Sequence, residues 1–231
     1  MKERKSKKYT GNKDISGVRE KIIGLIPKVD VFVEMFAGGA GIAKKIQKKV
    51  NEVVLIEKDF LQYSKLLLEF PSASIINDDC LRCWDEVKNL FSENRVLFFD
   101  PPYLFSTRNN NSVYYNCEMS IHDHIDFLDY ASSLREKCII IHPTCDLYNE
   151  KLRNWNYVEI KIRYHNKTSI ERIWYNYSTD IMKLDYIRSI DNFTKRQQFK
   201  RKLINLEKKF KRMKPDEKEF VLEFLKEKGV I

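Results

Sequence analysis

The chain has 231 residues, of which 43% are hydrophobic and 32% are charged, with seven glycines and six prolines. This composition excludes a disordered, collagenous or low-complexity protein, and the length allows one sizeable core rather than two full-sized domains. No apolar run approaches the roughly 20 residues that a membrane span requires. The N-terminal stretch MKERKSKKYTGNK is basic but has no apolar run, so we expect a cytoplasmic protein without a signal peptide.

The formal net charge of +9 is concentrated at the two ends of the chain. Lys195 to Lys214 carry ten basic side chains against one acid, Glu207, and the first 13 residues carry six against one. A near-neutral body with two basic ends predicts a polyanionic partner that is held from the edges. A solvated charged helix explains the charge alone equally well.

Helical and strand patterns alternate over residues 1–180, which we interpret as one domain. Short apolar runs predict strands over 29–36, 52–59, 73–79, 95–103, 137–143, 157–165 and 169–177. Amphipathic stretches predict helices over 14–26 (capped by Asp14 or Ser16), 42–50, 60–70, 81–92, 121–136 and 146–153. This alternation predicts an α/β fold, a doubly wound Rossmann-like sheet that is mostly parallel and has helices on both faces.

The last 51 residues, 181–231, form a second predicted segment of different character. Phe199, Leu203, Leu206 and Phe210 recur at helical spacing, and Pro215 begins a further amphipathic stretch. We therefore expect a basic C-terminal helical hairpin appended to the sheet domain.

A glycine-rich turn, Phe36-Ala37-Gly38-Gly39-Ala40-Gly41, follows the first strand. It matches neither the dinucleotide fingerprint nor the P-loop. Glu57 and Asp79 end the second and third strands, where an α/β nucleotide site places acceptors for ribose hydroxyls and for an adenine amino group. Each acid has an equally good interpretation as a helix N-cap. The three features together, on consecutive strands, favour a ligand that contains adenosine.

The tetrapeptide Asp100-Pro101-Pro102-Tyr103 ends the fourth strand. Two prolines remove two backbone donors and leave carbonyl acceptors on a stiff ridge, while Asp100 adds a carboxylate and Tyr103 a flat ring. Two acceptors beside an aromatic ring suit a planar group that bears an amino group. The structural alternative is a strand that ends in prolines.

These residues resemble the amino-methyltransferases of the DNA adenine methylase family, over residues 8–178. The resemblance implies that the chain is a site-specific DNA methyltransferase, which moves a methyl group from S-adenosylmethionine to the exocyclic N6 amino group of adenine. It implies catalytic roles for Asp100, Pro101, Pro102 and Tyr103, and no metal. The cofactor residues that it implies are Tyr9, Lys13, Phe36, Ala37, Gly38, Gly39, Glu57, Asp79 and Asp100.

The chain departs from the family at two points. Ala40 stands where many members have glycine. Many members also have a DNA-recognition insert between the turn and the tetrapeptide, whereas only 58 residues separate Gly41 from Asp100 here. Base selection must then come from elsewhere, and no target sequence is predicted. We expect the DNA contacts at Arg108, in the polar loop after the tetrapeptide, and at Lys195, Arg196, Lys202, Lys208, Lys209 and Arg212.

Two other functions remain open at this point. Sites of the Asp-Pro-Pro type also serve RNA, so an RNA adenine N6-methyltransferase is one alternative. A catalytically inactive nucleic-acid-binding protein on the same fold is the other, and the intact tetrapeptide argues against it. The sequence also leaves open a cognate restriction enzyme as a further partner.

Two further motifs are interpreted as structural. Cys80 and Cys83 have the spacing of zinc ligands, but no second pair accompanies them, so we expect the start of a helix. The same interpretation applies to His122 and His124. The five cysteines are expected to be reduced thiols.

Overall fold

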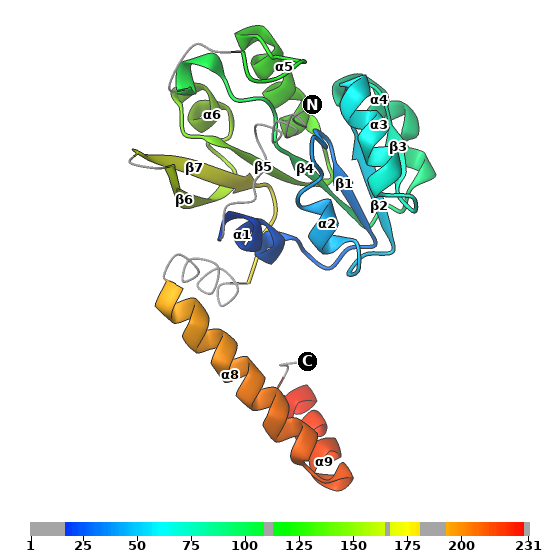
Figure 1. Ribbon diagram of the computed structural model, residues 1–231, viewed down its shortest axis with the longest axis vertical. Coiled ribbons are helices and arrows are strands. Elements are labelled where there is room, and N and C mark those ends of the chain that lie inside the picture. Colours follow the sequence, from blue (N-terminus) through cyan, green and yellow to red (C-terminus); the bar gives the residue numbers. More distant parts are fainter. Residues whose placement is uncertain (1–16, 109–112, 165–166, 181–192, 229–231) are drawn as a thin grey trace, which may run out of the picture. The chain divides into compact units, whose positions relative to one another are not determined.

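The computed structural model describes residues 17–108, 113–164, 167–180 and 193–228. The chain divides into two compact units, 1–188 and 189–231, which are described separately below (Figure 1). The boundary predicted between residues 180 and 181 falls at the edge of the described residues and stays a prediction. Asp14 and Ser16, the predicted caps of the first helix, lie outside the described residues.

A seven-stranded sheet in the order β3-β2-β1-β4-β5-β7-β6 organises the first unit. The first five of these strands run parallel, and β7 pairs antiparallel with both β5 and β6. The strands are β1 (Val31–Glu34), β2 (Glu52–Ile56), β3 (Ser74–Ile76), β4 (Arg95–Phe99), β5 (Lys137–Pro143), β6 (Asn156–Tyr164) and β7 (Lys167–Tyr175). Because β1 lies between β2 and β4, the strand order reverses there, and this is where open α/β sheets bind ligands. The predicted fold class is confirmed.

Each face of the sheet has its own apolar core, because successive side chains of a strand point to opposite faces. On β1, Phe32 packs into one core and its neighbours Val31 and Val33 into the other. The first core is covered by α1 (Val18–Leu25), α2 (Ala43–Ile46) and α3 (Phe60–Glu69). The second is covered by α4 (Cys80–Val87), α5 (Ile121–Ser133) and α6 (Asp146–Lys151). Helices on both faces make the sheet doubly wound.

The helices differ from the predictions mainly in length. The helix predicted over 42–50 is one turn, α2, because the chain must turn at once to enter β2: the Lys49 N–H donates to the Ile46 carbonyl at 2.7 Å, and the Asn51 N–H to the Asp30 carbonyl at 2.8 Å. Helix α4 begins at Cys80, as predicted, and continues as a 3-10 turn, η1 (Lys88–Leu90). A second 3-10 turn, η2 (Phe105–Thr107), follows the tetrapeptide.

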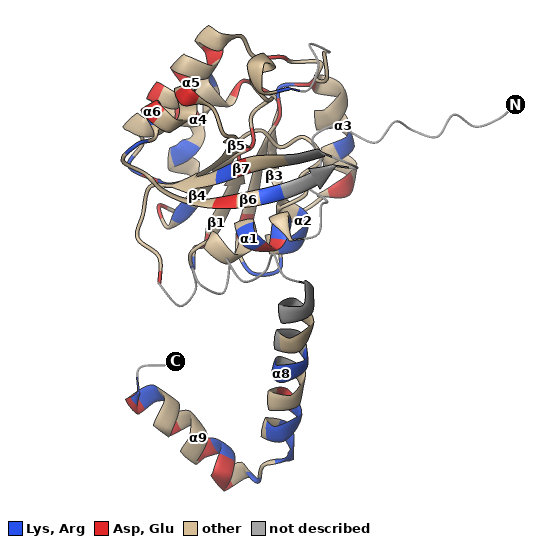
Figure 2. Ribbon diagram, turned by 90° about the vertical axis from the view of Figure 1, so that its left-hand side faces the viewer, with Lys and Arg blue, Asp and Glu red and all other residues tan. Residues whose placement is uncertain are grey.

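The second unit contains α8 (Phe193–Arg212) and α9 (Pro215–Glu227), which confirms the predicted pair of helices. Pro215 occupies the first turn of α9, and the Lys214 N–H donates to the Glu217 carboxylate at 2.9 Å. Lys202, Lys208, Lys209 and Arg212 are exposed on α8 (Figure 2). The side chains of Lys195 and Arg196 lie outside the described residues. Among the helices that are described, none is long and apolar enough to cross a membrane.

Candidate active site

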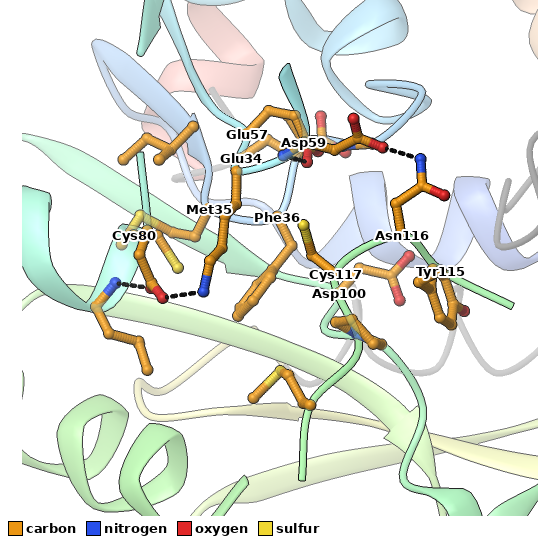
Figure 3. A pocket seen from close by; sticks show the side chains of 18 of the residues that line it. Glu34, Met35, Phe36, Glu57, Asp59, Cys80, Asp100, Tyr115, Asn116 and Cys117 are labelled. Carbon is orange, nitrogen blue, oxygen red and sulfur yellow. Dashed lines mark hydrogen bonds and ion pairs between the residues drawn. The ribbon is translucent and has the colours of Figure 1, made fainter. Parts of the chain in front are cut away.

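A cavity opens at the carboxyl ends of β1, β2, β3 and β4, where the topology predicts a ligand site (Figure 3). It brings together seven residues that the sequence predicts for the cofactor and Pro102 from the tetrapeptide. The predicted residues that line it are Phe36, Ala37, Gly38, Gly39, Glu57, Asp79, Asp100 and Pro102. Tyr9 and Lys13 lie outside the described residues, and their roles stay predictions.

The glycine-rich turn uses backbone conformations that most residues avoid. Gly38 has φ of 49°, and Ala40 has φ of 48° although it carries a Cβ atom. The Ala40 N–H donates to the Ala37 carbonyl at 2.6 Å, which closes the turn. At Gly39, an added Cβ atom would meet no other atom within 4 Å. The turn therefore leaves open space at a position that lines the cavity.

Glu57 fastens this turn to the end of β2. One carboxylate oxygen accepts the Gly38 N–H at 2.6 Å and the other accepts the Asp59 N–H at 2.8 Å. The carbonyl of Gly38 is held as well, because it accepts a hydrogen bond from the Gln62 amide at 2.6 Å. Burial raises the pKa of Glu57. Glu57 thus supports the backbone of the turn, and its contact with a ribose stays a prediction.

Asp79 is the N-cap of α4, as the alternative interpretation proposed. One oxygen accepts the Leu81 N–H at 3.0 Å, and the other pairs with Lys58 at 2.9 Å. The hydrogen bond with Asp79 raises the pKa of Lys58. Both side chains line the cavity. An adenine amino group near Asp79 would therefore meet a carboxylate whose direction is already fixed.

The lining of the cavity is rich in carboxylates and contains one lysine, Lys58. The most deeply buried acid of this lining is Glu34, at the end of β1, which accepts the Ala43 N–H at 3.0 Å. Burial raises the pKa of Glu34 to about 8, and the charge of Asp100 acts in the same direction. Such an environment favours a cationic ligand. The acidic side chains of the lining are Glu34, Glu57, Asp59, Asp78, Asp79, Asp100, Glu118 and Asp123.

The tetrapeptide is divided between the cavity and the interior. Asp100 and Pro102 line the cavity, whereas Pro101 is buried and Tyr103 is half-buried, and neither belongs to the lining. The Tyr103 hydroxyl donates to Glu171 at 2.5 Å. The Leu104 N–H that follows donates to Nε2 of His142 at 3.0 Å. The tetrapeptide is therefore anchored to β5 and β7 just beyond the end of β4.

Arg108 does not lie where the sequence analysis expects a DNA contact. Its side chain is only 1% exposed and forms a two-pronged pair with Glu118. Its guanidinium also donates to the Tyr103 carbonyl, at 2.8 Å from Nε, and lies over the rings of Phe105, Tyr114 and Tyr115. A phosphate contact needs an accessible cation, so the structure corrects this prediction. Arg108 instead holds the polar loop against the tetrapeptide.

Residues 115–119 form a wall of the cavity. Tyr115 belongs to the polar loop that the sequence predicts beside the site, whereas residues 116–119 are not predicted. Glu118 accepts the N–H groups of Tyr114 and Tyr115 at 2.8 and 3.1 Å, which folds the wall around Arg108. The Asn116 amide donates to Asp59 at 2.6 Å and links the wall to the end of β2 (Figure 3). The only sequence signal is the position of this polar, aromatic stretch directly after the tetrapeptide.

Comparisons with known proteins give one matching family model and several similar solved structures. The family model of the D12 class N6 adenine-specific DNA methyltransferases matches residues 64–190, more than half of the chain. Curated protein sequences give no match. Similar solved structures include a precorrin 8W decarboxylase from Methanobacterium thermoautotrophicum, at 14% identity over 70% of this chain and 89% of that one, with a TM-score of 0.46. A precorrin-6y C5,15-methyltransferase from Geobacter metallireducens is 12% identical over 68% of this chain and 87% of that one, with a TM-score of 0.45. An rRNA methylase from Streptococcus thermophilus is 9% identical over 69% of this chain and 94% of that one, with a TM-score of 0.44.

Proposed function

Because this chain belongs to the D12 class N6 adenine-specific DNA methyltransferases, which use S-adenosylmethionine as methyl donor, we propose that it methylates the exocyclic N6 amino group of adenine in DNA. One observation carries the proposal. The glycine-rich turn, Glu57 and Asp79 line the same cavity as Asp100 and Pro102, so a cofactor site and an amino-group acceptor site share one space.

The lining fits S-adenosylmethionine in shape and in charge. Gly39 leaves room beside the turn, and Glu57 and Asp79 stand at the ends of adjacent strands. The excess of carboxylates over the single lysine suits a ligand that carries a sulfonium and an ammonium group. We assign Phe36, Ala37, Gly38, Gly39, Glu57, Asp79 and Asp100 to its binding. When bound, the cofactor supplies an electrophilic methyl group.

The residues of the tetrapeptide orient the amino group that receives the methyl group. We assign the Asp100 carboxylate and the Pro101 carbonyl as acceptors of hydrogen bonds from its two N–H groups, although Pro101 does not belong to the cavity lining. These bonds draw the nitrogen lone pair out of conjugation with the ring. After the target base has flipped out of the DNA stack, it stacks on the ring of Tyr103. Transfer is then a direct displacement whose rate depends on positioning and charge complementarity. The Asp100 carboxylate would also stabilise the positive charge that develops on the amino nitrogen as it forms its bond to the methyl carbon.

The helices of the second unit provide a surface for the DNA backbone. Lys202, Lys208, Lys209 and Arg212 are exposed on α8, and long cationic side chains on one helix suit contacts with successive phosphates. We include Lys195 and Arg196 in this surface from their place in the sequence.

The proposal is tested by methyl transfer in vitro followed by mapping. Purified protein is incubated with tritiated S-adenosylmethionine and either unmethylated duplex DNA or structured RNA, and the products are digested to nucleosides. We expect labelled N6-methyl-2′-deoxyadenosine from DNA and no labelled N6-methyladenosine from RNA, and sequencing of the methylated DNA then locates the target. Label in RNA alone would replace the substrate assignment. Cofactor binding without any transfer would support an inactive binding protein.

A further inference from the structure

Three buried side chains hold three different groups of Tyr103 and Leu104. The Tyr103 hydroxyl donates to Glu171, the Tyr103 carbonyl accepts from Arg108, and the Leu104 N–H donates to His142. These side chains are separated from the tetrapeptide by up to 68 residues of sequence. The peptide group that joins Tyr103 and Leu104 is thus fixed by two contacts, and the Tyr103 ring is fixed at its far end by a third.

The sheet register explains how Glu171 reaches this position. β5 and β7 run antiparallel, and Glu171 lies opposite Pro143, the residue after His142. His142 is held in turn: its Nδ1 lies 2.8 Å from the Pro143 carbonyl, and its ring stacks on Tyr148 at 3.8 Å. The Nδ1–H therefore donates and leaves Nε2 as the acceptor for Leu104, an assignment made from the hydrogen-bond pattern.

The burial of Glu171 indicates that its carboxylate has a specific task. Its exposed fraction is 0%, and a buried carboxylate is costly unless it is hydrogen-bonded. The Tyr103 ring meets the His142 ring only edge-on, with 5.4 Å between the centroids. The bond between the Tyr103 hydroxyl and Glu171 holds the far end of the ring, opposite the backbone contacts.

We propose that Glu171 is a positioning residue for methyl transfer, which acts through the Tyr103 hydroxyl to align the ring on which the target base stacks. The inference rests on the proposed function, in which Tyr103 meets the base. A ring that is free to swing would lose alignment in the reacting complex, and misplacement of this kind lowers the rate of transfer more than it weakens binding. Glu171 does not line the cavity, and we expect its substitution to leave cofactor affinity unchanged.

A double-mutant cycle tests the inference, with DNA as substrate. Tyr103→Phe removes only the hydroxyl, Glu171→Leu removes the acceptor while keeping its bulk, and Glu171→Gln keeps an acceptor oxygen. We expect Tyr103→Phe and Glu171→Leu each to lower kcat on the order of tenfold to a hundredfold. The double variant should lose no more than either single variant, and Glu171→Gln should retain most of the activity. Tyr157→Phe, at an exposed tyrosine of β6, is the matched control.

Further measurements separate alignment from general damage to the fold. The KM for S-adenosylmethionine and the Kd for S-adenosylhomocysteine should stay at wild-type values in all variants. Losses that add in the double variant, or a Tyr103→Phe enzyme as active as wild type, would overturn the inference while leaving the proposed function intact. If Glu171→Leu does not fold, Tyr103→Phe and Glu171→Gln still decide the question. A wild-type enzyme that forms no N6-methyladenine overturns the proposed function itself, and this inference with it.

Discussion

The carboxylate of Glu57 accepts the backbone N–H of Gly38 at 2.6 Å and so ties the end of β2 to the turn that follows β1. The sequence suggests only a ligand contact or a helix cap for this acid. In the structure, its carboxylate accepts a backbone N–H of the turn that borders the cavity. Gln62 holds the other side of Gly38. The shape of the turn that borders the cavity therefore depends on the position of the Glu57 carboxylate.

Glu57→Ala should weaken the binding of S-adenosylhomocysteine by about 1–3 kcal/mol, because charged hydrogen bonds are lost. Isothermal titration measures this affinity. Gln62→Ala is the control, since it loosens the same turn from a side chain outside the cavity lining. If the two variants lose equal affinity, Glu57 acts only through the turn and its direct contact with the ligand is rejected.

Asp100→Ala should reduce methyl transfer on the order of a hundredfold or more, because in the proposed mechanism the carboxylate contacts the amino group mainly in the transition state. The thermal unfolding midpoint should stay close to that of wild type. Single-turnover kinetics with saturating cofactor measure the loss, and Asp126→Ala, at an exposed position of α5, provides the control. Turnover within a few-fold of wild type would mean that the assigned mechanism is wrong.

The cavity could be predicted because its parts follow strands that the sequence marks clearly. Gly38, Glu57, Asp79 and Asp100 each lie within four residues of the end of a strand, and parallel strands bring their carboxyl ends to one edge. Arg108 could not be placed in this way. Its partner Glu118 lies ten residues away in a polar stretch without periodicity, so the sequence shows an exposed loop where the structure has a buried ion pair.

Two other positions show the same limit. Asp79 is both an N-cap and a cavity residue, and one sequence pattern predicts both roles without ranking them. The partnership of Tyr103 with Glu171 depends on the antiparallel register of β5 and β7, which no local pattern reports. The difference from the family at Ala40, by contrast, can be understood locally. Many members have glycine at this position, and the φ of 48° at Ala40 belongs to the region that glycine occupies without strain.

The raised pKa of Glu34 should make the stability of the protein depend on pH. Its folded pKa of about 8 lies above the ordinary value of 4.5, so the buried group favours folding in its protonated form. This stability is present below pH 4.5 and is lost as the pH rises through 8. Glu34→Gln keeps an acceptor for Ala43 and cannot ionise. We compare the free energy of unfolding of this variant with that of wild type, both measured without cofactor. The difference in favour of the variant should increase from pH 5 to pH 8, by up to about 1.4 kcal/mol for each unit by which the pKa is raised.

For this measurement, Glu69→Gln, at an exposed position of α3, is the control for the change of charge. A difference between Glu34→Gln and wild type that stays constant with pH would show that Glu34 ionises normally in the folded protein.

Arg108→Met should destabilise the fold without changing the salt dependence of DNA binding. The variant leaves Glu118 without its cation in a largely buried place, and breaking such a pair costs about 3 kcal/mol or more. Urea unfolding measures the first effect and salt titration of DNA affinity the second. The opposite outcome, unchanged stability with a flatter salt slope, would restore Arg108 as a phosphate contact.

The last prediction concerns the lysines near the end of α8. Each phosphate that a lysine neutralises releases counterions, so the logarithm of DNA affinity should fall with the logarithm of salt concentration by about 0.9 per contact. Changing Lys208, Lys209, Lys211 and Arg212 together to Gln deletes four exposed charges and preserves helix propensity. DNA affinity should drop, and the slope should flatten by up to about 3–4 if all four contact phosphate. The same change at Lys44, Lys45, Lys48 and Lys49, around α2, removes equal charge from the first unit and should leave the slope nearly unchanged. S-adenosylhomocysteine affinity should be that of wild type in both variants. Equal slopes for the α8 variant and wild type would mean that these side chains form only a solvated face.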